Sequence, residues 1–441
     1  MKSLAARLLV AVTLRLVLPA AAAPAAPELA FPGAMGWAAT TPGGRGGQIL
    51  RVTTLAADGP GSFLAVLNTP GPRIIVFEVG GVIDLRTVTG PRHNSVSIKE
   101  PFLTIAGQTA PSPGITFIRG GISIETHDVV IRHIRVRPGA AGYAKKSGWE
   151  PDSMATTGAA WNVIVDHSSF TWSIDENLST SGKAFTGTTA EEWRKNTSHR
   201  VTFSNNIIAE GLSHATHASG EHSKGTLLMD NVTDVLIVGN LYANCSQRHP
   251  LAKGGTWVAV VNNFMFNPGV QAVAYRLPDV LWHDRKFEIG KMDLVGNVMR
   301  AGADTREGLA LLLLEGIGDL ALHLADNVVL DRDGGPSPLT AIAKGATGEI
   351  REQAKNVHWP PYLDPIPASA VEESVLKNAG ARPWDRDAID QRIVRQSRNR
   401  TGRIIDNEEQ VGGYPVMPET RGTFNAADWD LRTMERKTTV R

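Results

Sequence analysis

Short apolar runs rich in Val and Ile recur along most of this chain, and an asparagine stands at or near the end of many of them. Alternation of β-branched residues, bounded by Gly, Asn and Ser, is typical of β-strands. The steps between these asparagines are roughly 20–35 residues, a spacing typical of a solenoid whose coils stack on one another. The asparagines are Asn205, Asn206, Asn240, Asn262, Asn263, Asn297 and Asn327.

An asparagine at the same corner of each coil can hydrogen-bond to its neighbours in the coils above and below. Such a ladder pairs amide groups that would otherwise be buried without partners. It predicts that Asn206, Asn240 and Asn263 lie near stacked corners of an all-β solenoid between about residues 48 and 345. A β-sandwich or a propeller is the alternative, because strand spacing alone does not separate these folds. Helix-length amphipathic stretches are scarce, which disfavours a βαβ sheet.

The two ends of the chain have other compositions. Residues 1–23 have the pattern of a signal peptide, with Lys2 and Arg7 before an apolar run from Leu8 to Leu18 and small residues from Ala20 to Ala23. An amphipathic helix is the alternative, but the nearby prolines would truncate it. We therefore expect a secreted or periplasmic protein. Residues 24–345 form the expected solenoid domain, and 346–441, charged and interrupted by prolines, form an extension that packs on the solenoid or caps it.

Charge and cysteine content narrow the classes of partner. Lys+Arg 45 against Asp+Glu 44 gives a net charge of +1, which argues against a nucleic-acid binder that neutralises phosphates. No later apolar run approaches the length needed to cross a bilayer, so we expect no membrane partner. Cys245 is the single cysteine, which rules out an intramolecular disulfide.

Three acidic residues fall near the ends of successive predicted strands. They are Asp152, Asp175 and Glu176. In a stacked coil, residues one turn apart become neighbours in space, and carboxylates brought together in this way repel one another unless a cation joins them. Hard oxygen ligands suit Ca²⁺. For an isolated Asp-Glu pair the ordinary alternative is a solvated turn.

The segment that contains these residues resembles a motif of a known family. Val163-Ile-Val-Asp-His-Ser-Ser-Phe-Thr-Trp-Ser is similar to the Trp-Ile-Asp-His-Cys-Ser-Phe-Ser-Trp segment of the parallel β-helix pectate lyases. The resemblance covers most of the mature chain, in the order expected of the family. It includes Phe31-Pro-Gly-Ala-Met-Gly-Trp, Ile105-Ala-Gly-Gln-Thr, Ile131-Arg-His-Ile-Arg-Val-Arg-Pro-Gly, Arg248-His-Pro, Thr401-Gly-Arg-Ile-Ile-Asp and Val411-Gly-Gly-Tyr-Pro.

The resemblance implies a right-handed, single-stranded parallel β-helix and a calcium site. The family's first calcium aspartate falls on Asp152, and its next acidic ligand falls on Asp175, with Glu176 adjacent. A further family aspartate is Ser179 here, which removes a charge and implies weaker calcium binding, or binding completed by the substrate carboxylate. Glu150 is a weaker candidate ligand. Asp166 and His167, in the strand motif, are expected to be structural.

The resemblance also implies a basic half of the site. The family's proton-abstracting arginine falls on Arg248, and its second arginine is Lys253, which keeps the charge but loses the bidentate fork. The family's substrate-binding lysine falls on Lys224, in His222-Ser-Lys-Gly-Thr-Leu, with His222 as a further substrate-binding residue. Should Arg248 only anchor a carboxylate, Lys224 is the next candidate base.

Zinc is an alternative ligand for the histidines of this region. They are His214, His217 and His222, and they lie in one loop that carries no flanking set of Cys or carboxylate ligands.

The expected activity is β-elimination on polygalacturonate or pectin by a monomeric pectate lyase, to yield 4,5-unsaturated oligogalacturonides. A bound cation and the lysines would stabilise the charge that develops when the proton leaves C5. Arginine is normally not deprotonated in proteins, so the role of Arg248 rests on the resemblance. Two alternatives stay open: a glycoside hydrolase on the same fold, which would use paired carboxylates, and a non-catalytic solenoid that binds polysaccharide.

Overall fold

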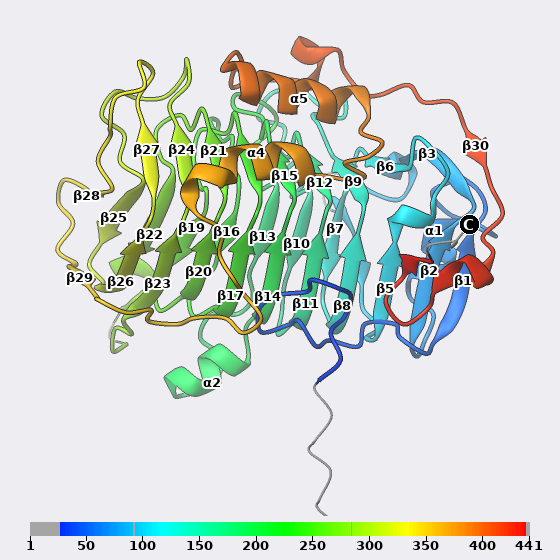
Figure 1. The fold of residues 1–441 in the computed structure, drawn as a ribbon, viewed down its shortest axis with the longest axis horizontal. Helices are drawn as coiled ribbons and strands as arrows, with labels where there is room; N and C mark the ends of the chain where they lie inside the picture. Colours follow the sequence, from blue (N-terminus) through cyan, green and yellow to red (C-terminus); the bar gives the residue numbers. More distant parts are fainter. Residues whose placement is uncertain (1–26, 91–92, 284, 438–441) are drawn as a thin grey trace, which may run out of the picture.

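A computed structural model describes residues 27–90, 93–283 and 285–437 of the chain (Figure 1). The predicted signal peptide, residues 1–23, lies outside the described residues. Within the described part, no helix combines the length and the apolarity that a membrane span requires.

Three parallel sheets run side by side along the molecule (Figure 1). The eleven-stranded sheet contains, in spatial order, β1 (Gln48–Val52), β2 (Arg73–Phe77), β5 (Leu103–Ala106), β8 (His127–Arg132), β11 (Trp161–Asp166), β14 (His199–Ser204), β17 (Thr233–Val238), β20 (Trp257–Val261), β23 (Gly290–Val295), β26 (Leu320–Ala325) and β29 (Ile350–Glu352).

The other two sheets complete each coil. The ten-stranded sheet contains β3 (Val79–Asp84), β6 (Ile115–Ile118), β9 (Ile134–Arg137), β12 (Ser169–Thr171), β15 (Ile207–Ala209), β18 (Leu241–Ala243), β21 (Phe264–Phe266), β24 (Val298–Arg300), β27 (Val328–Leu330) and, antiparallel at its edge, β30 (Thr420–Arg421). The nine-stranded sheet contains β4 (Ser95–Ile98), β7 (Gly121–Ile124), β10 (Met154–Thr156), β13 (Leu178–Thr180), β16 (Leu227–Leu228), β19 (Leu251–Lys253), β22 (Val273–Leu277), β25 (Leu312–Gly316) and β28 (Thr340–Ile342).

Strand numbers rise by three between neighbours within the coils, so each coil gives one strand to each sheet in turn. This confirms the predicted all-β parallel β-helix. Apolar side chains of equivalent strands stack inside the coils in register, as Val129, Val163 and Val201 do, all fully buried. Full burial of a Val side chain contributes about 1.5–3 kcal/mol, and a continuous core of such side chains explains why the strands read as unbroken apolar runs.

The asparagine ladder is present at the corner between the eleven- and ten-stranded sheets. The Nδ2 atom of each amide donates to the Oδ1 atom of the next coil's amide, at 3.0 Å from Asn206 to Asn240, 2.9 Å from Asn240 to Asn263 and 3.0 Å from Asn263 to Asn297. Residues just before the ladder adopt a left-handed backbone, with φ of 54° at Asn205. Asn and Gly tolerate this conformation, which explains their recurrence at the corner.

The few helices lie outside the coils, apart from a short one near the first coil. They are α1 (Phe63–Leu67), α2 (Ala190–Lys195), α3 (Asp279–Trp282), α4 (Ala368–Asn378) and α5 (Ala388–Asn399), with 3₁₀ turns η1 (Leu85–Thr87), η2 (Gly107–Thr109), η3 (Glu408–Val411) and η4 (Ala426–Asp428) and a small hairpin of β31 (Trp429–Asp430) and β32 (Glu435–Arg436).

The C-terminal extension returns along the outside of the solenoid. Apolar side chains of α4 and α5, such as Val371 and Ile393, join a buried cluster with Ile207 and Phe264 on the outer face of the ten-stranded sheet. Further on, β30 pairs with β3, so the chain ends beside the first coils (Figure 1). The division of the chain at residue 345 stays a prediction, and β29, which follows it, completes the eleven-stranded sheet.

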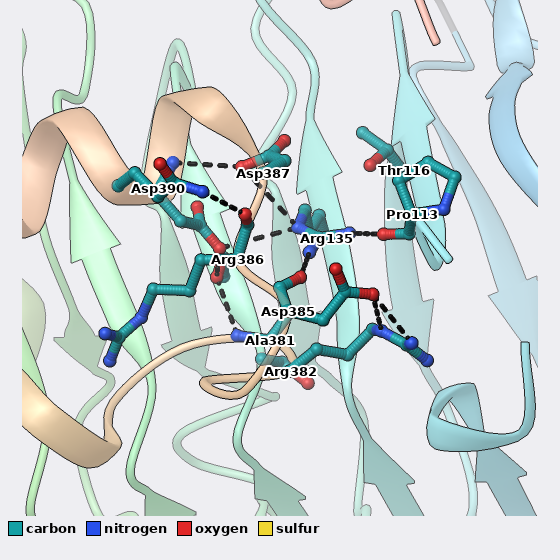
Figure 2. Close-up of polar contacts among 12 residues, drawn as sticks. Pro113, Thr116, Arg135, Ala381, Arg382, Asp385, Arg386, Asp387 and Asp390 are labelled. Atoms are coloured by element: carbon teal, nitrogen blue, oxygen red, sulfur yellow. Dashed lines mark hydrogen bonds and ion pairs between the residues drawn. The ribbon is translucent and has the colours of Figure 1, made fainter. Parts of the chain in front are cut away.

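Buried ion pairs hold the extension to the coils (Figure 2). Arg137 places one guanidinium nitrogen 2.5 Å from Asp387 and another 2.8 Å from Asp390. Arg135 Nε lies 3.4 Å from Asp390, and the hydroxyl of Ser169 donates to the same carboxylate at 2.7 Å. Because these charges are desolvated, removing one partner leaves an unpaired buried charge and is strongly destabilising.

Candidate active site

Chemically functional side chains gather where the chain passes from the ten-stranded to the nine-stranded sheet. Asp152 precedes β10, Glu176 precedes β13, and Lys224 precedes β16. Parallel bridges join Glu176 to Lys224 and Lys224 to Gln247, which places Arg248 in the next coil. Stacking of coils therefore brings together residues that are far apart in sequence.

Three carboxylates converge in this cluster. Asp152, Asp175 and Glu176 each offer an oxygen, and these atoms lie within 4.8 Å of one another. The Asp152 carboxylate is held by two donors: the Glu176 backbone N–H at 2.9 Å and the Ser179 hydroxyl at 2.8 Å. Ser179 therefore orients Asp152 at the position where the resembling family carries another acid.

The surroundings shift the pKa values of two of these carboxyl groups in opposite directions. Burial, and then the charge of Asp175, raise the pKa of Asp152 to about 8. Burial also acts to raise the pKa of Asp175, but the hydrogen bond from His222 and the charge of Lys224 outweigh it, and its pKa is lowered. The carboxylate oxygens converge, and their mutual repulsion disfavours ionisation of one of them. Such a set of oxygen donors fits a hard divalent cation such as Ca²⁺.

Two basic side chains face the carboxylates. Arg248 forms an ion pair with the buried Glu176, and Lys224 Nζ lies 3.9 Å from Asp175 Oδ1. Burial is the main cause that lowers the pKa of both the Lys224 ammonium and the Arg248 guanidinium. Desolvation makes the charged form less favourable, which is what a lysine or an arginine needs if it is to accept a proton.

His222 lies between the basic and acidic groups. Its Nε2 atom is 2.5 Å from Lys224 Nζ and 3.2 Å from Asp175 Oδ1. The ring is buried and stacks on that of His217, with centroids 3.3 Å apart. The prediction that His222 binds substrate stays a prediction, and its position beside Lys224 is the observation relevant to it.

The three histidines considered as zinc ligands do not all come together in the structure. His214 is not in the cluster, because its ring contacts Asp406 at 3.1 Å. His217 and His222 do gain a carboxylate, Asp175, within 4.8 Å. However, His217 Nδ1 accepts a hydrogen bond from the Ser219 backbone N–H, and the Lys224 ammonium lies against His222 Nε2, so one ring nitrogen of each histidine is already engaged and a cation faces the second ring. This arrangement fits a zinc site poorly.

Two predicted residues lie at the margin of the cluster. Lys253 Nζ is 2.9 Å from Asp230 Oδ2, a fully buried carboxylate, so its charge is already paired. Glu150 Oε1 accepts a hydrogen bond from the Ala218 backbone N–H at 2.7 Å and is 3.7 Å from His217. Substrate binding by Lys253 and metal binding by Glu150 stay predictions.

Arg276 is a site residue that the sequence did not indicate. It is exposed on β22, in register with Lys253 on β19 and Glu315 on β25. Its charge is among the causes that lower the pKa of Arg248, after burial. Arg276 occupies the position one coil after Lys253, which could have indicated it from the sequence. Because the coils differ in length, however, the two residues can be matched only once the strands are paired.

Comparisons with known proteins agree with the fold and the motifs. A sequence model of the pectate lyase family matches residues 1–302. A protein named probable pectate lyase C from Aspergillus flavus is 30% identical over 392 residues, which cover 87% of this chain and 81% of that protein. One of the same name from Emericella nidulans is 36% identical over 244 residues, which cover 55% of this chain and 48% of that protein, about half its length.

Solved structures are similar in fold at low sequence identity. A pectate lyase bound to a hexasaccharide superposes with a TM-score of 0.55 at 14% identity, covering 82% of this chain and 100% of that one. A Bacillus subtilis pectate lyase gives 0.54 at 13% identity, covering 81% and 99%. With a family match over more than half of its length and a relative aligned over most of both chains, this chain belongs to the pectate lyase family.

Proposed function

We propose that this chain cleaves polygalacturonate by β-elimination, with Arg248 as the base and Lys224 as the residue that binds and stabilises the reacting uronate. The observation that carries the proposal is the placement of Lys224 and Arg248 directly against three converging carboxylates. The relatives named as pectate lyases and the similar lyase structure bound to a hexasaccharide support the substrate class.

The reaction needs a proton acceptor near C5 of the sugar and a positive field at its carboxylate. Arg248 takes the C5 proton, the electron pair forms the C4=C5 double bond, and the C4–O bond breaks. The departing C4 oxygen takes up a proton and becomes the new chain end. Lys224 stabilises the negative charge that spreads onto the uronate carboxylate during proton removal. Burial of Arg248, which lowers its pKa, supports its role as acceptor.

A divalent cation would be held by Asp152, Asp175 and Glu176. When bound, it supplies positive charge to the substrate carboxylate and acidifies the C5 proton. Ser179 donates to Asp152 instead of adding a fourth charge, which supports calcium binding that is weak by itself and is completed by the substrate. Release of Glu176 from Arg248 to the cation would also free the guanidinium. Export and a monomeric state are part of the proposal and rest on the sequence.

One observation favours a hydrolase as the second candidate. Asp152, with a pKa raised to about 8, and Asp175, with a lowered pKa, resemble the acid and base of a glycosidase. The two basic side chains against these carboxylates favour elimination, because a hydrolase has no need to stabilise an enolate-like charge.

The deciding experiment is product analysis on polygalacturonate and on highly methylated pectin, with and without chelator. We expect ultraviolet absorbance from the 4,5-unsaturated ends on polygalacturonate, and its loss in chelator. New reducing ends without absorbance would establish hydrolysis. Binding without new ends of either kind would leave a polysaccharide-binding solenoid.

A further inference from the structure

A cavity lies at the corner between the eleven- and ten-stranded sheets, whereas the proposed active site lies at the corner between the ten- and nine-stranded sheets. The cavity has a volume of about 660 Å³ and is lined from the coils by Gln108, His133 and His167, and from the extension by Trp384 and Trp429. None of its lining residues belongs to the cluster around Asp152 and Arg248. The site is therefore separate from the proposed active site.

Trp384 stands open to solvent at this cavity although its backbone is firmly anchored. Its side chain is 62% exposed. The residues that flank Trp384 are held in place: Arg382 forms an ion pair with Asp385 at 2.8 Å (Figure 2). Arg382 also donates to the Ala110 carbonyl at 2.8 Å, and the Ala381 N–H donates to Ser169 Oγ at 2.9 Å. The ring is further fixed by edge contact with His133, with centroids 4.9 Å apart. An indole held in one position without being covered loses little entropy when a ligand stacks on it.

Polar atoms without partners lie beside this indole. His133 is 4% exposed, and its Nδ1 atom has no hydrogen-bond partner among the described residues. Gln108 Oε1 is also buried and, in the same part of the chain, unpaired. A buried polar atom without a partner costs about 1–3 kcal/mol. Both residues line the cavity, and a rotation of either side chain would turn its unpaired atom towards the hydroxyl groups of a bound ligand.

Two of the three arginines that line the cavity are already paired, and only Arg436 has no ion pair among the described residues. Arg132 contacts Asp166 at 3.1 Å and Glu435 at 2.7 Å, and Arg382 is occupied by Asp385. The cavity therefore offers no free cluster of cations for a phosphate. It offers an aromatic face, a neutral imidazole and amide groups, a combination suited to a pyranose ring, which has an apolar face and a rim of hydroxyls.

We propose that this cavity is a second, non-catalytic saccharide-binding site, in which a pyranose ring stacks on Trp384 and its hydroxyls bond to His133 and Gln108. The inference rests on the proposed function only in naming galacturonan as the first ligand to test. A site of this kind would hold the polymer beside the enzyme and raise the local concentration of chain at the active site.

The test is a binding titration of the whole protein with trigalacturonate and, in a second arm, with a neutral galactose trimer, which distinguishes uronate from neutral pyranose. Trp384→Ala should lower the affinity of this site at least about fivefold, the loss expected of a well-packed aromatic anchor. Trp384→Phe should retain part of the affinity, because a smaller ring still stacks. Gln108→Ala should lower it with the indole intact.

Tyr362→Ala is the matched control, because Tyr362 is 48% exposed and does not line the cavity. It should bind both trimers as the wild type does. The rate of formation of unsaturated product from the trimer, measured on the same samples, should not change in Trp384→Ala. A wild type that yields no unsaturated product would refute the proposed lyase activity while the titration still decides this site. Equal affinity of Trp384→Ala and wild type for both trimers would overturn the inference.

Discussion

Arg248 has a backbone conformation that few arginines adopt, with φ of 69°. Non-glycine residues with positive φ are uncommon and persist where the surrounding structure holds them. Here the neighbouring coils hold the backbone, since the Arg248 carbonyl accepts from the Thr226 N–H at 2.7 Å. The side chain is thereby directed at Glu176, with which it forms an ion pair. The unusual backbone conformation of Arg248 and its ion pair therefore both depend on the packing of neighbouring coils.

Replacement of Arg248 by lysine tests whether this residue acts in catalysis or in binding. Arg248→Lys keeps the positive charge but changes the reach of the group, so we expect kcat to fall roughly 10²–10⁴-fold, the usual worth of a general base, with polygalacturonate binding retained. Steady-state kinetics measure both quantities. Arg398→Lys is the control, since Arg398 lies half-exposed on α5 of the extension, away from the cluster, and it should keep kcat. A variant Arg248→Lys with normal kcat and a raised KM would make Arg248 an anchor and Lys224 the first candidate base.

The buried side chain of His249 should make the free energy of unfolding depend on pH. Burial lowers its pKa from 6.5 to about 3, and neither ring nitrogen has a partner among the described residues. The folded state keeps the ring neutral while the unfolded chain takes up a proton below about pH 6.5, so stability falls as the pH falls from there towards 3. Each such proton contributes a slope of about 1.4 kcal/mol per pH unit. His249→Phe should reduce the slope by that amount in urea unfolding at several pH values, and an unchanged slope would contradict the assignment.

At the scale of elements, the asparagine ladder is what keeps the strands of successive coils in register at the corner. Asn263 accepts from both the backbone N–H and the side-chain amide of Asn240, and it donates to Asn297. All three residues are fully buried. Water cannot replace these bonds, whereas the ladder's last member, Asn327, is only half-buried.

The position of an asparagine in the ladder therefore sets the cost of removing it. Asn263→Ala leaves two donors of Asn240 buried and unpaired, and we expect a loss of about 2–5 kcal/mol in the free energy of unfolding. Asn327→Ala, at the open end, should cost less, because solvent can reach the group it leaves. Chemical denaturation of the two variants measures the difference. Equal losses would mean that the ladder contributes through local turns and not through its chain of amides.

At the scale of the whole molecule, the coils are joined by one continuous apolar core and by the C-terminal extension that packs along their outside. A continuous buried cluster extends from Val52 in β1 to Val329 in β27. The extension starts beyond β29, packs α4 and α5 on the ten-stranded sheet and pairs β30 with β3 (Figure 1). Such a strap opposes the separate unfolding of single coils that is usual in open solenoids. A ligand bound between two coils should then stabilise the whole protein.

Calcium binding should stabilise the whole protein, and the size of this stabilisation should depend on pH. In the folded state the pKa of Asp152 is raised to about 8, so without cation the folded chain holds an extra proton above pH 4 and stability falls as the pH rises towards 8. Calcium held by the three carboxylates, as proposed, would displace that proton, so its stabilisation should grow over the same window. An excess of about 100 times the Kd contributes about 2.7 kcal/mol.

Thermal unfolding at pH 5 and pH 9, with and without calcium, measures this effect. Glu176→Gln should abolish the gain in Tm. Glu373→Gln, which removes an exposed carboxylate on α4 that pairs with Arg398, should keep it. A gain that is equal at both pH values would show that Asp152 is not a ligand.

The sequence by itself indicated an all-β solenoid, because short apolar runs and a recurring corner asparagine are local consequences of one coil geometry repeated many times. Its resemblance to the pectate lyases, and not the strand pattern, singled out the parallel β-helix from the sandwich and the propeller. The strand pattern also indicated Asp152, Asp175 and Glu176, which fall near the ends of successive strands, whereas Lys224 and Arg248 were indicated by the family motifs in which they lie.

Only the tertiary structure decided the partners between coils. Strand register places Arg276 next to Lys253, where its charge lowers the pKa of Arg248. Lys253 is paired with Asp230, and Arg137 meets Asp387 across 250 residues. The loops between strands differ in length from coil to coil, so a sequence separation does not give a distance. Side chains that carry no motif, such as Trp384, acquire their neighbours only when the coils and the returning extension pack together.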